Sequence, residues 1–383
     1  MSQLEEVLKQ LIAERGPLSF RNFMTLALYH PEHGYYSSGA VRTGRAGHFM
    51  TSAELDPSFG ELWAHGLEQV WESCGRPVPF EVVEVGGGEG GFAASVLEAT
   101  TVPLSYRLVE RVEEVERRQR QRLSHFSGVS WSRTIDEVAA GSAHFVIAVE
   151  VLDNLPVHVI ERVDGTLREI YVDGKLREVL GGLSTPALKS FGYHLGNGER
   201  CEVGLDAIGM ATNVARLVDC GVACFIDYGY EGPGRQTLVS YSGAGPSSDL
   251  LTTPGERDIT AHVNWDSIGS AFRKEGLEVA GPSPQAQVLR ALGAAELDRR
   301  LRNSHATALA GGKGAEAVRA LSRRHALRAL LDEGGLGGLQ VVAGYRGILK
   351  SRPDFSKHGT PPPGPAAEPR EMSWLLSVYL PCI

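Results

Sequence analysis

Short apolar runs alternate with stretches of helical periodicity between residues 59 and 345. Runs bounded by glycine, proline or acidic residues are typical of strands buried in a parallel sheet, and the helical stretches between them predict crossover helices. The runs lie at 80–85, 105–110, 129–131, 144–150 and 222–226, and two more, at 277–280 and 339–345, are positioned to close the sheet. The pattern predicts an α/β fold.

Both ends of the chain follow a different pattern. Apolar residues at helical spacing predict helices at 3–14 and 18–29, and residues 30–60 are rich in glycine, aromatic and hydroxyl side chains, which is typical of a structured loop. We therefore expect residues 1–60 to form N-terminal helices and a loop that covers the cofactor or the substrate. Residues 351–383 are rich in proline and glycine, which predicts a disordered tail.

The core, residues 61–350, contains two predicted insertions. Between 157 and 180 the apolar positions switch to a period of two, and two Asp-Gly pairs mark hairpin turns. This predicts an inserted antiparallel β-meander, which together with the following helix covers about 157–215. A loop and several helices form the second insertion, at about 235–335.

The composition excludes some classes of partner. The 383 residues carry a net charge of -8, so no overall basic field attracts nucleic acid or an anionic membrane. The first residues show no basic-then-apolar signal, and no apolar run is long enough to span a bilayer. The five scattered cysteines lack the paired spacing of a zinc site and indicate a reducing compartment. We expect a cytoplasmic protein without metal, nucleic-acid or membrane partners, and a homo-oligomer is left open.

A glycine-rich loop follows the first of these strands. Gly86, Gly88 and Gly90 leave no Cβ on the inner side of the turn, so a ligand can approach the backbone. Read as Gly86-x-Gly88-x-x-Gly91, the stretch also satisfies the dinucleotide fingerprint, so two classes of cofactor fit the glycines alone. Glu84 and Glu89 favour S-adenosylmethionine, because nearby carboxylates repel a pyrophosphate but tolerate a cationic sulfonium.

Two further positions are predicted to hold this cofactor. Glu110 closes the second strand, where a carboxylate accepts hydrogen bonds from ribose hydroxyls in folds of this kind. Ile135 follows the third strand, where the adenine is expected to lie.

Acidic residues also follow the fourth and fifth strands. Glu150 and Asp153 stand three residues apart after the fourth, and Asp227 and Tyr228 end the fifth. Because ligands of open α/β sheets bind at the carboxyl ends of the strands, we expect these residues at the cofactor crevice or its rim. They form the second candidate site.

Several segments together resemble one family, the MidA-like S-adenosylmethionine-dependent methyltransferases, which include the mitochondrial assembly factor for respiratory complex I. The matching segments, in order, are His30–Tyr36, Gly47–Glu54, Phe59–Leu62, the glycine loop, Glu150–His158, Asp227–Tyr230, Asp258–Val263 and Gly281–Pro282 with Gln285. The resemblance runs from about residue 17 to residue 345. It implies a class I, Rossmann-like methyltransferase core with an extra helical region.

The resemblance also implies a reaction, because the studied mitochondrial member of the family methylates an arginine of a protein. Methyl transfer is mainly a matter of positioning and of removing a proton from the nucleophile. A guanidinium, with a pKa above about 12, needs carboxylates that orient it. Glu150, Asp153 and Asp227 are the predicted catalytic residues. For Glu150 and Asp153 the alternative is that they cap the following turn or bind the amino group of the cofactor, and Asp227 is the weaker candidate of the three.

Residues on either side of these acids complete the predicted site. Thr51 and Ser52 are expected to cover the cofactor, and the predicted acceptor-binding residues are Glu54, Asn154, Pro156, His158 and Tyr228.

The chain departs from the family pattern at Glu89 in the glycine loop, and at Val149, Val151, Leu152 and Asn154 after the fourth strand. Because most of these changes fall at the predicted substrate rim, they leave the acceptor open between a protein side chain and a small molecule. A non-catalytic assembly factor that retains the fold is a third interpretation. A dinucleotide oxidoreductase is the least supported, because the chain has no obvious hydride-transfer acid.

Overall fold

The computed structural model describes residues 2–37, 51–242 and 245–348. Residues 38–50 of the expected covering loop and the whole expected tail lie outside these ranges. None of the helices in the described ranges has the length and apolar character needed to cross a membrane.

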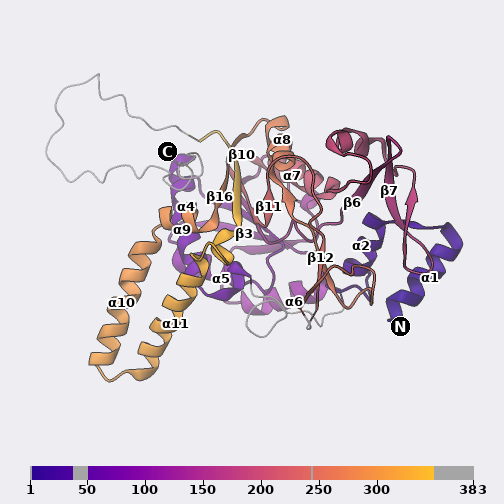
Figure 1. The fold of residues 1–383 in the computed structure, drawn as a ribbon. Helices are drawn as coiled ribbons and strands as arrows, with labels where there is room; N and C mark the ends of the chain where they lie inside the picture. The colour runs from indigo at the N-terminus through magenta and orange to yellow at the C-terminus, as the bar shows by residue number, and fades with distance from the viewer. Residues whose placement is uncertain (1, 38–50, 243–244, 349–383) are drawn as a thin grey trace, which may run out of the picture.

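A seven-stranded sheet forms the centre of the molecule (Figure 1). In spatial order its strands are β16 (Glu278–Pro284), β17 (Gln340–Arg346), β10 (Val218–Asp227), β5 (Ala143–Val149), β2 (Phe80–Val85), β3 (Leu104–Val109) and β4 (Val129–Ser132). Strands β10, β5, β2, β3 and β4 pair in parallel, whereas β17 is antiparallel to both of its neighbours. The predicted strands are confirmed, including the two that close the sheet.

Side chains along each central strand alternate between two apolar layers. In β5, Phe145 and Ile147 belong to one layer, and Val146 and Ala148 belong to the other. Helices that contribute to the first layer are α4 (Ser58–Ser73), α5 (Gly91–Ala99), α9 (Gln285–Ala291), α10 (Ala294–Ala310) and α11 (Gly314–Leu330). Helices α7 (Leu205–Leu217) and α8 (Trp265–Lys274) contribute to the second. Burial on both faces explains why the strands are continuously apolar.

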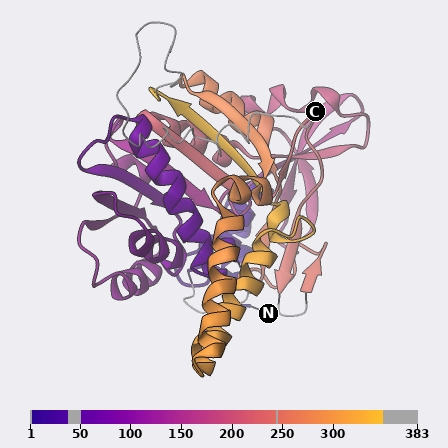
Figure 2. The same cartoon turned by 90° about the vertical axis from the view of Figure 1, so that its left-hand side faces the viewer.

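Helices α10 and α11 lie side by side as a long hairpin that projects from the sheet (Figures 1 and 2). The sequence predicts a single helix over 284–301, but the structure breaks it into α9 and α10. Gly293, between them, has a φ of 102°. A backbone in this region ends a right-handed helix, and glycine adopts it without a Cβ clash.

A second sheet joins the inserted meander to the N-terminal segment. The meander consists of β6 (His158–Val163), β7 (Thr166–Val172) and β8 (Glu178–Gly181), and the sheet is completed by β9 (Arg200–Val203) and by β1 (Leu18–Ser19). Side chains of α1 (Gln3–Arg15) and α2 (Phe20–Tyr29), among them Leu8 and Phe23, share an apolar cluster with Val159 and Val172 of the meander. The N-terminal helices therefore pack on the insertion, far from the α10–α11 hairpin (Figure 1).

Residues 229–264 contain structure that the sequence does not predict. Strands β12 (Val239–Ser242), β13 (Gly245–Ser247) and β14 (Asp258–Thr260) form a small antiparallel sheet, and β11 (Gly229–Tyr230) pairs with β15 (Val263–Asn264). Polar, glycine-rich strands lack the apolar alternation that marks a half-buried strand. The remaining short elements are α3 (Ser52–Leu55), α6 (Glu113–Arg122), η1 (Ile135–Glu137), η2 (Pro186–Ser190), η3 (Gly192–His194) and η4 (Leu336–Gly338).

Candidate active site

A cavity of about 1360 Å³ opens at the carboxyl ends of β2, β3, β5 and β10. Predicted residues on its walls are Thr51, Gly86, Gly88, Glu110, Ile135, Glu150, Asp153, Asn154 and Tyr228. Predicted residues that do not line it are Ser52, Glu54, Glu84, Gly90, Pro156, His158 and Asp227. The structure thus separates residues that face a ligand from residues that support them.

The glycine loop has the backbone that the sequence predicts. Gly86 and Gly88 have φ values of 69° and 50°, in the region that favours glycine. A Cβ on Gly86 would lie 2.8 Å from a methyl group of Val151, so no larger residue fits there without displacing the loop after β5. The loop therefore brings bare backbone to the cavity wall.

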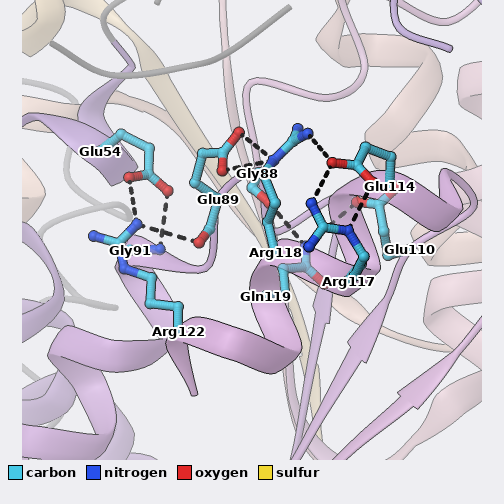
Figure 3. Close-up of polar contacts among 10 residues, drawn as sticks. All are labelled: Glu54, Gly88, Glu89, Gly91, Glu110, Glu114, Arg117, Arg118, Gln119 and Arg122. Carbon is cyan, nitrogen blue, oxygen red and sulfur yellow. Dashed lines mark hydrogen bonds and ion pairs between the residues drawn. The ribbon is translucent and has the colours of Figure 1, made fainter. Parts of the chain in front are cut away.

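Glu54 binds the start of α5 instead of the acceptor, which corrects its predicted role. Its carboxylate accepts a hydrogen bond of 2.9 Å from the Gly91 N–H, and Arg122 donates to its other oxygen over 3.1 Å (Figure 3). The Glu54 side chain is nearly buried. The N-terminus of a helix after a glycine loop is where dinucleotide-binding proteins hold a phosphate, and here a carboxylate already occupies it.

Glu89, which the sequence suggests would repel a phosphate, is neutralised. Its carboxylate forms an ion pair of 2.9 Å with Arg118, and Arg122 donates to its backbone carbonyl (Figure 3). Glu54, and not Glu89, is therefore the carboxylate that disfavours a pyrophosphate at this loop.

Glu84 supports the glycine loop from below. It is buried, accepts a hydrogen bond of 2.8 Å from the Tyr106 hydroxyl, and lies close under Gly87. Burial raises the pKa of Glu84 to about 8, so the carboxyl is largely protonated at neutral pH. A neutral group inside the loop fits a supporting role better than direct contact with a cation.

This raised pKa predicts how stability depends on pH. The carboxyl group holds its proton more tightly in the folded than in the unfolded protein, where its pKa is about 4.5. Its contribution is therefore complete below about pH 4.5 and is lost as the pH rises through about 8. We expect the Tm to fall between about pH 5 and pH 8.5. Glu84→Gln, which still accepts from Tyr106, should flatten the dependence, and an equally steep curve in this variant would contradict the assignment.

Gln119 connects the glycine loop to the predicted ribose-binding residue, and sequence reasoning missed it. Its amide nitrogen donates to the Gly88 carbonyl over 2.9 Å and lies 3.4 Å from the Glu110 carboxylate (Figure 3). Its amide oxygen accepts from the Trp131 indole over 3.0 Å. Gln119 is fully buried in α6, a helix rich in charged residues. The signal available in the sequence was an uncharged glutamine within a helix made mostly of charged residues.

Glu110 itself faces the cavity. One of its oxygens accepts a hydrogen bond of 2.9 Å from the Val112 N–H, and burial raises its pKa to about 7. Ile135, at the start of η1, and Met210 of α7 line the same cavity, and both pack against the second apolar layer. This pairing of a carboxylate with an apolar slot is the chemistry that a ribose and an adenine require.

We expect Gln119→Met to weaken the binding of S-adenosyl-homocysteine by about tenfold, because the Gly88 carbonyl, the Glu110 carboxylate and the Trp131 N–H lose their common partner. Isothermal titration calorimetry measures the effect. Gln121→Met, on the exposed side of α6, is the matched control. Unchanged affinity in Gln119→Met would remove this residue from cofactor positioning.

Glu150 stands at a strained turn immediately after β5. Its φ is 53°, unusual for a residue with a side chain, and its carboxylate accepts a hydrogen bond of 2.8 Å from the Ser52 N–H. Burial raises the pKa of Glu150 to about 8. Ser52 is fully buried, and its hydroxyl accepts from Gln285 over 3.0 Å. Ser52 therefore holds Glu150 in place. It does not line the cavity, in contrast to its predicted role in covering the cofactor.

Asp227 holds the turn after β5, in contrast to its predicted catalytic role. One of its oxygens accepts from the N–H groups of Val151, Leu152 and Asp153 at 2.8–3.2 Å, and the other accepts from the Tyr228 N–H over 2.8 Å. The residue is 1% exposed. Asp227 accepts hydrogen bonds from these backbone N–H groups and does not line the cavity. It therefore positions the turn that carries Glu150 and Asp153.

Asp153 is the buried acid that the turn presents to the cavity. The residue is 7% exposed, and within the described ranges its Oδ1 has no hydrogen-bond partner. Burial raises its pKa well above the ordinary range, with further contributions from Asp227, Asp258 and Glu150. An orphaned carboxylate oxygen in a cavity wall is suited to a ligand that donates hydrogen bonds.

Asp258, on β14, was not predicted as a site residue, although it opens one of the segments on which the family resemblance depends. It is buried, lines the cavity, and accepts hydrogen bonds from Tyr36 and Asn154. His158 and Pro156, predicted to contact the acceptor, are buried away from the cavity, and His158 contacts Glu169 at 2.7 Å instead. The chain turns into β6 at this point and leaves the site.

Comparisons with known proteins agree with this geometry. The sequence model of a family described as "Putative S-adenosyl-L-methionine-dependent methyltransferase" matches residues 62–283. The mitochondrial protein arginine methyltransferase NDUFAF7 homolog of Drosophila melanogaster is 30% identical over 344 residues, which cover 78% of this chain and 77% of that protein. The protein arginine methyltransferase NDUFAF7 of Rattus norvegicus is 29% identical over 319 residues, covering 74% and 72%.

Among solved structures, a protein from Burkholderia thailandensis bound to S-adenosyl-homocysteine superposes with a TM-score of 0.77 at 26% identity, over 90% of this chain and 92% of that one. The predicted class I methyltransferase fold and the predicted cofactor are confirmed. The resemblance to the MidA-like family is confirmed as well. The chain belongs to this family of S-adenosyl-L-methionine-dependent methyltransferases.

Proposed function

We propose that the protein transfers the methyl group of S-adenosyl-L-methionine to a guanidinium nitrogen of an arginine in another protein. The observation that carries the proposal is the orphaned Oδ1 of Asp153, a buried acid on the wall of the cavity and on the same turn as Glu150. The curated relatives, which are named protein arginine methyltransferases, support the same acceptor.

The residues that line the cavity fit the methyl donor. Gly86 and Gly88 offer unobstructed backbone, Glu110 offers a carboxylate for the ribose, and Ile135 offers an apolar surface for the adenine. Thr51 lines the cavity from the N-terminal side. When bound there, S-adenosyl-L-methionine supplies an electrophilic methyl group.

The two acids at the turn then act on the acceptor. A guanidinium is a poor nucleophile because it is positively charged and gives up its proton only above about pH 12. Glu150 and Asp153 orient the group by charge-assisted hydrogen bonds and localise its charge away from the reacting nitrogen. Glu150, with its raised pKa, is the group that takes the proton as the methyl group is transferred.

The test is to follow a labelled methyl group. Purified protein is incubated with labelled S-adenosyl-L-methionine and an extract separated into macromolecules and small molecules. We expect the label in protein, and in methylated arginine after hydrolysis. We expect Asp153→Asn to lose most of the transfer and Asp249→Asn, on an exposed turn, to retain it. Label in small molecules or in a different amino acid would contradict an arginine acceptor.

A further inference from the structure

The cavity extends beyond the part that fits the cofactor. Pockets that hold one drug-sized ligand usually enclose about 300–1000 Å³. The cavity of about 1360 Å³ therefore has room for a second molecule. Tyr29 and Tyr36 from the N-terminal segment, Tyr228 after β10, and the acids Asp153 and Asp258 line the same cavity.

Asp258 is fixed in this wall by two neutral donors. Its Oδ1 accepts a hydrogen bond of 2.9 Å from the Tyr36 hydroxyl and one of 3.0 Å from the Asn154 amide. The residue is 3% exposed. Within the described part of the chain, no arginine, lysine or histidine pairs with Glu150, Asp153 or Asp258. The two donors orient the Asp258 carboxylate, and within these ranges neither of them carries a positive charge.

A cation is the occupant that such a wall selects. Burying carboxylates without a partner is costly, and a cation with several N–H donors removes that cost. Aromatic faces add a favourable surface for a planar guanidinium. The protein provides an example within the cavity itself, where the guanidinium of Arg111 lies 4.5 Å from the centre of the Tyr29 ring.

We propose that Asp258 is a specificity-determining residue that binds the positive charge of the acceptor, in a subsite completed by Tyr36 and Asn154. The inference rests on the proposed function of the same cavity, and it gives the acids of the cavity different roles. Glu150 and Asp153 act at the reacting nitrogen, whereas Asp258 distinguishes a cationic acceptor from a neutral one of the same shape. The acceptor is therefore a cationic side chain, and the residue that recognises its charge lies on β14, outside the methyltransferase sheet.

Binding of two isosteric probes tests the inference without knowledge of the protein acceptor. The protein, saturated with S-adenosyl-homocysteine, is titrated with n-butylguanidinium and with neutral n-butylurea. We expect wild type to prefer the cation by about tenfold or more, the effect of one charge-assisted hydrogen bond. Asp258→Asn should lower this preference at least several-fold, leaving only the part that Glu150 and Asp153 supply, and Asp258→Glu should retain it. Asp249→Asn is the control from the same insertion.

Two outcomes would overturn the inference: a preference for the cation in Asp258→Asn that equals that of wild type, or a wild-type protein that does not discriminate between the probes. The affinity for S-adenosyl-homocysteine, expected to be equal in all variants, reports that each one is folded. Failure of the proposed function has a different signature. In that case the label of the transfer assay appears outside protein arginine, while Asp258→Asn still loses its preference for butylguanidinium.

Discussion

Replacing Glu150 by glutamine is expected to lower kcat for methyl transfer by about 10²- to 10⁴-fold, the usual range for a positioned general base. The amide oxygen of glutamine still accepts the hydrogen bond from the Ser52 N–H, so the turn is retained and only the carboxylate is lost. In the free protein burial raises the pKa of Glu150 to about 8. A guanidinium bound beside Glu150 stabilises the ionised carboxylate and lowers its pKa, so that the carboxylate can accept the proton.

Initial rates with labelled methyl donor measure this effect, and titration with S-adenosyl-homocysteine shows whether the cofactor site is intact. Glu256→Gln is the matched control, because Glu256 is exposed and lies outside the cavity. If Glu150→Gln turns over like wild type while binding the cofactor normally, Glu150 has no part in the chemical step. If both the rate and the cofactor affinity fall together, its role is to hold the cofactor.

Replacing Asp227 by alanine is expected to lower the free energy of unfolding by about 3–4 kcal/mol, because four N–H groups lose their acceptor inside the protein. Three of these donors belong to the turn after β5. The loss of activity should therefore accompany the loss of stability. Urea unfolding followed by fluorescence measures the change.

Asp227→Asn provides a finer comparison, because its amide oxygen can still accept hydrogen bonds, and we expect it to fall between wild type and Asp227→Ala. Asp219→Ala is the control from the same strand, since Asp219 is exposed at the other end of β10. An Asp227→Ala variant as stable as Asp219→Ala would mean that the N–H groups of the turn find other acceptors.

The central sheet could be predicted from the sequence because its strands are buried on both faces, which makes them continuously apolar. Strands β12 to β14 are short and polar, and their backbone pairing leaves no such trace in the sequence. For the same reason Asp258, which lies in this polar segment, was not predicted as a site residue. Its place in the cavity depends on a pairing between β12 and β14.

The sequence was enough to predict which loops form the site, but not which atoms each side chain contacts. An acid at the end of a strand looks the same in the sequence whether it faces a ligand, as Asp153 does, or receives backbone N–H groups, as Asp227 does. Glu54 illustrates a second limit. Its capping of α5 depends on two segments that are 37 residues apart and meet only in the folded chain.

The hydrogen bond from Ser52 to Glu150 has a consequence for the smallest part of the chain that can work. The family match begins at residue 62, yet Ser52, Glu54 and the tyrosines at 29 and 36 all precede it. A fragment that starts at residue 62 would keep the sheet and the glycine loop. It would lose the hydrogen bond that Ser52 donates to Glu150, the Glu54 carboxylate at the start of α5, and the two tyrosines of the cavity wall. The N-terminal segment is therefore as much a part of the enzyme as the sheet is.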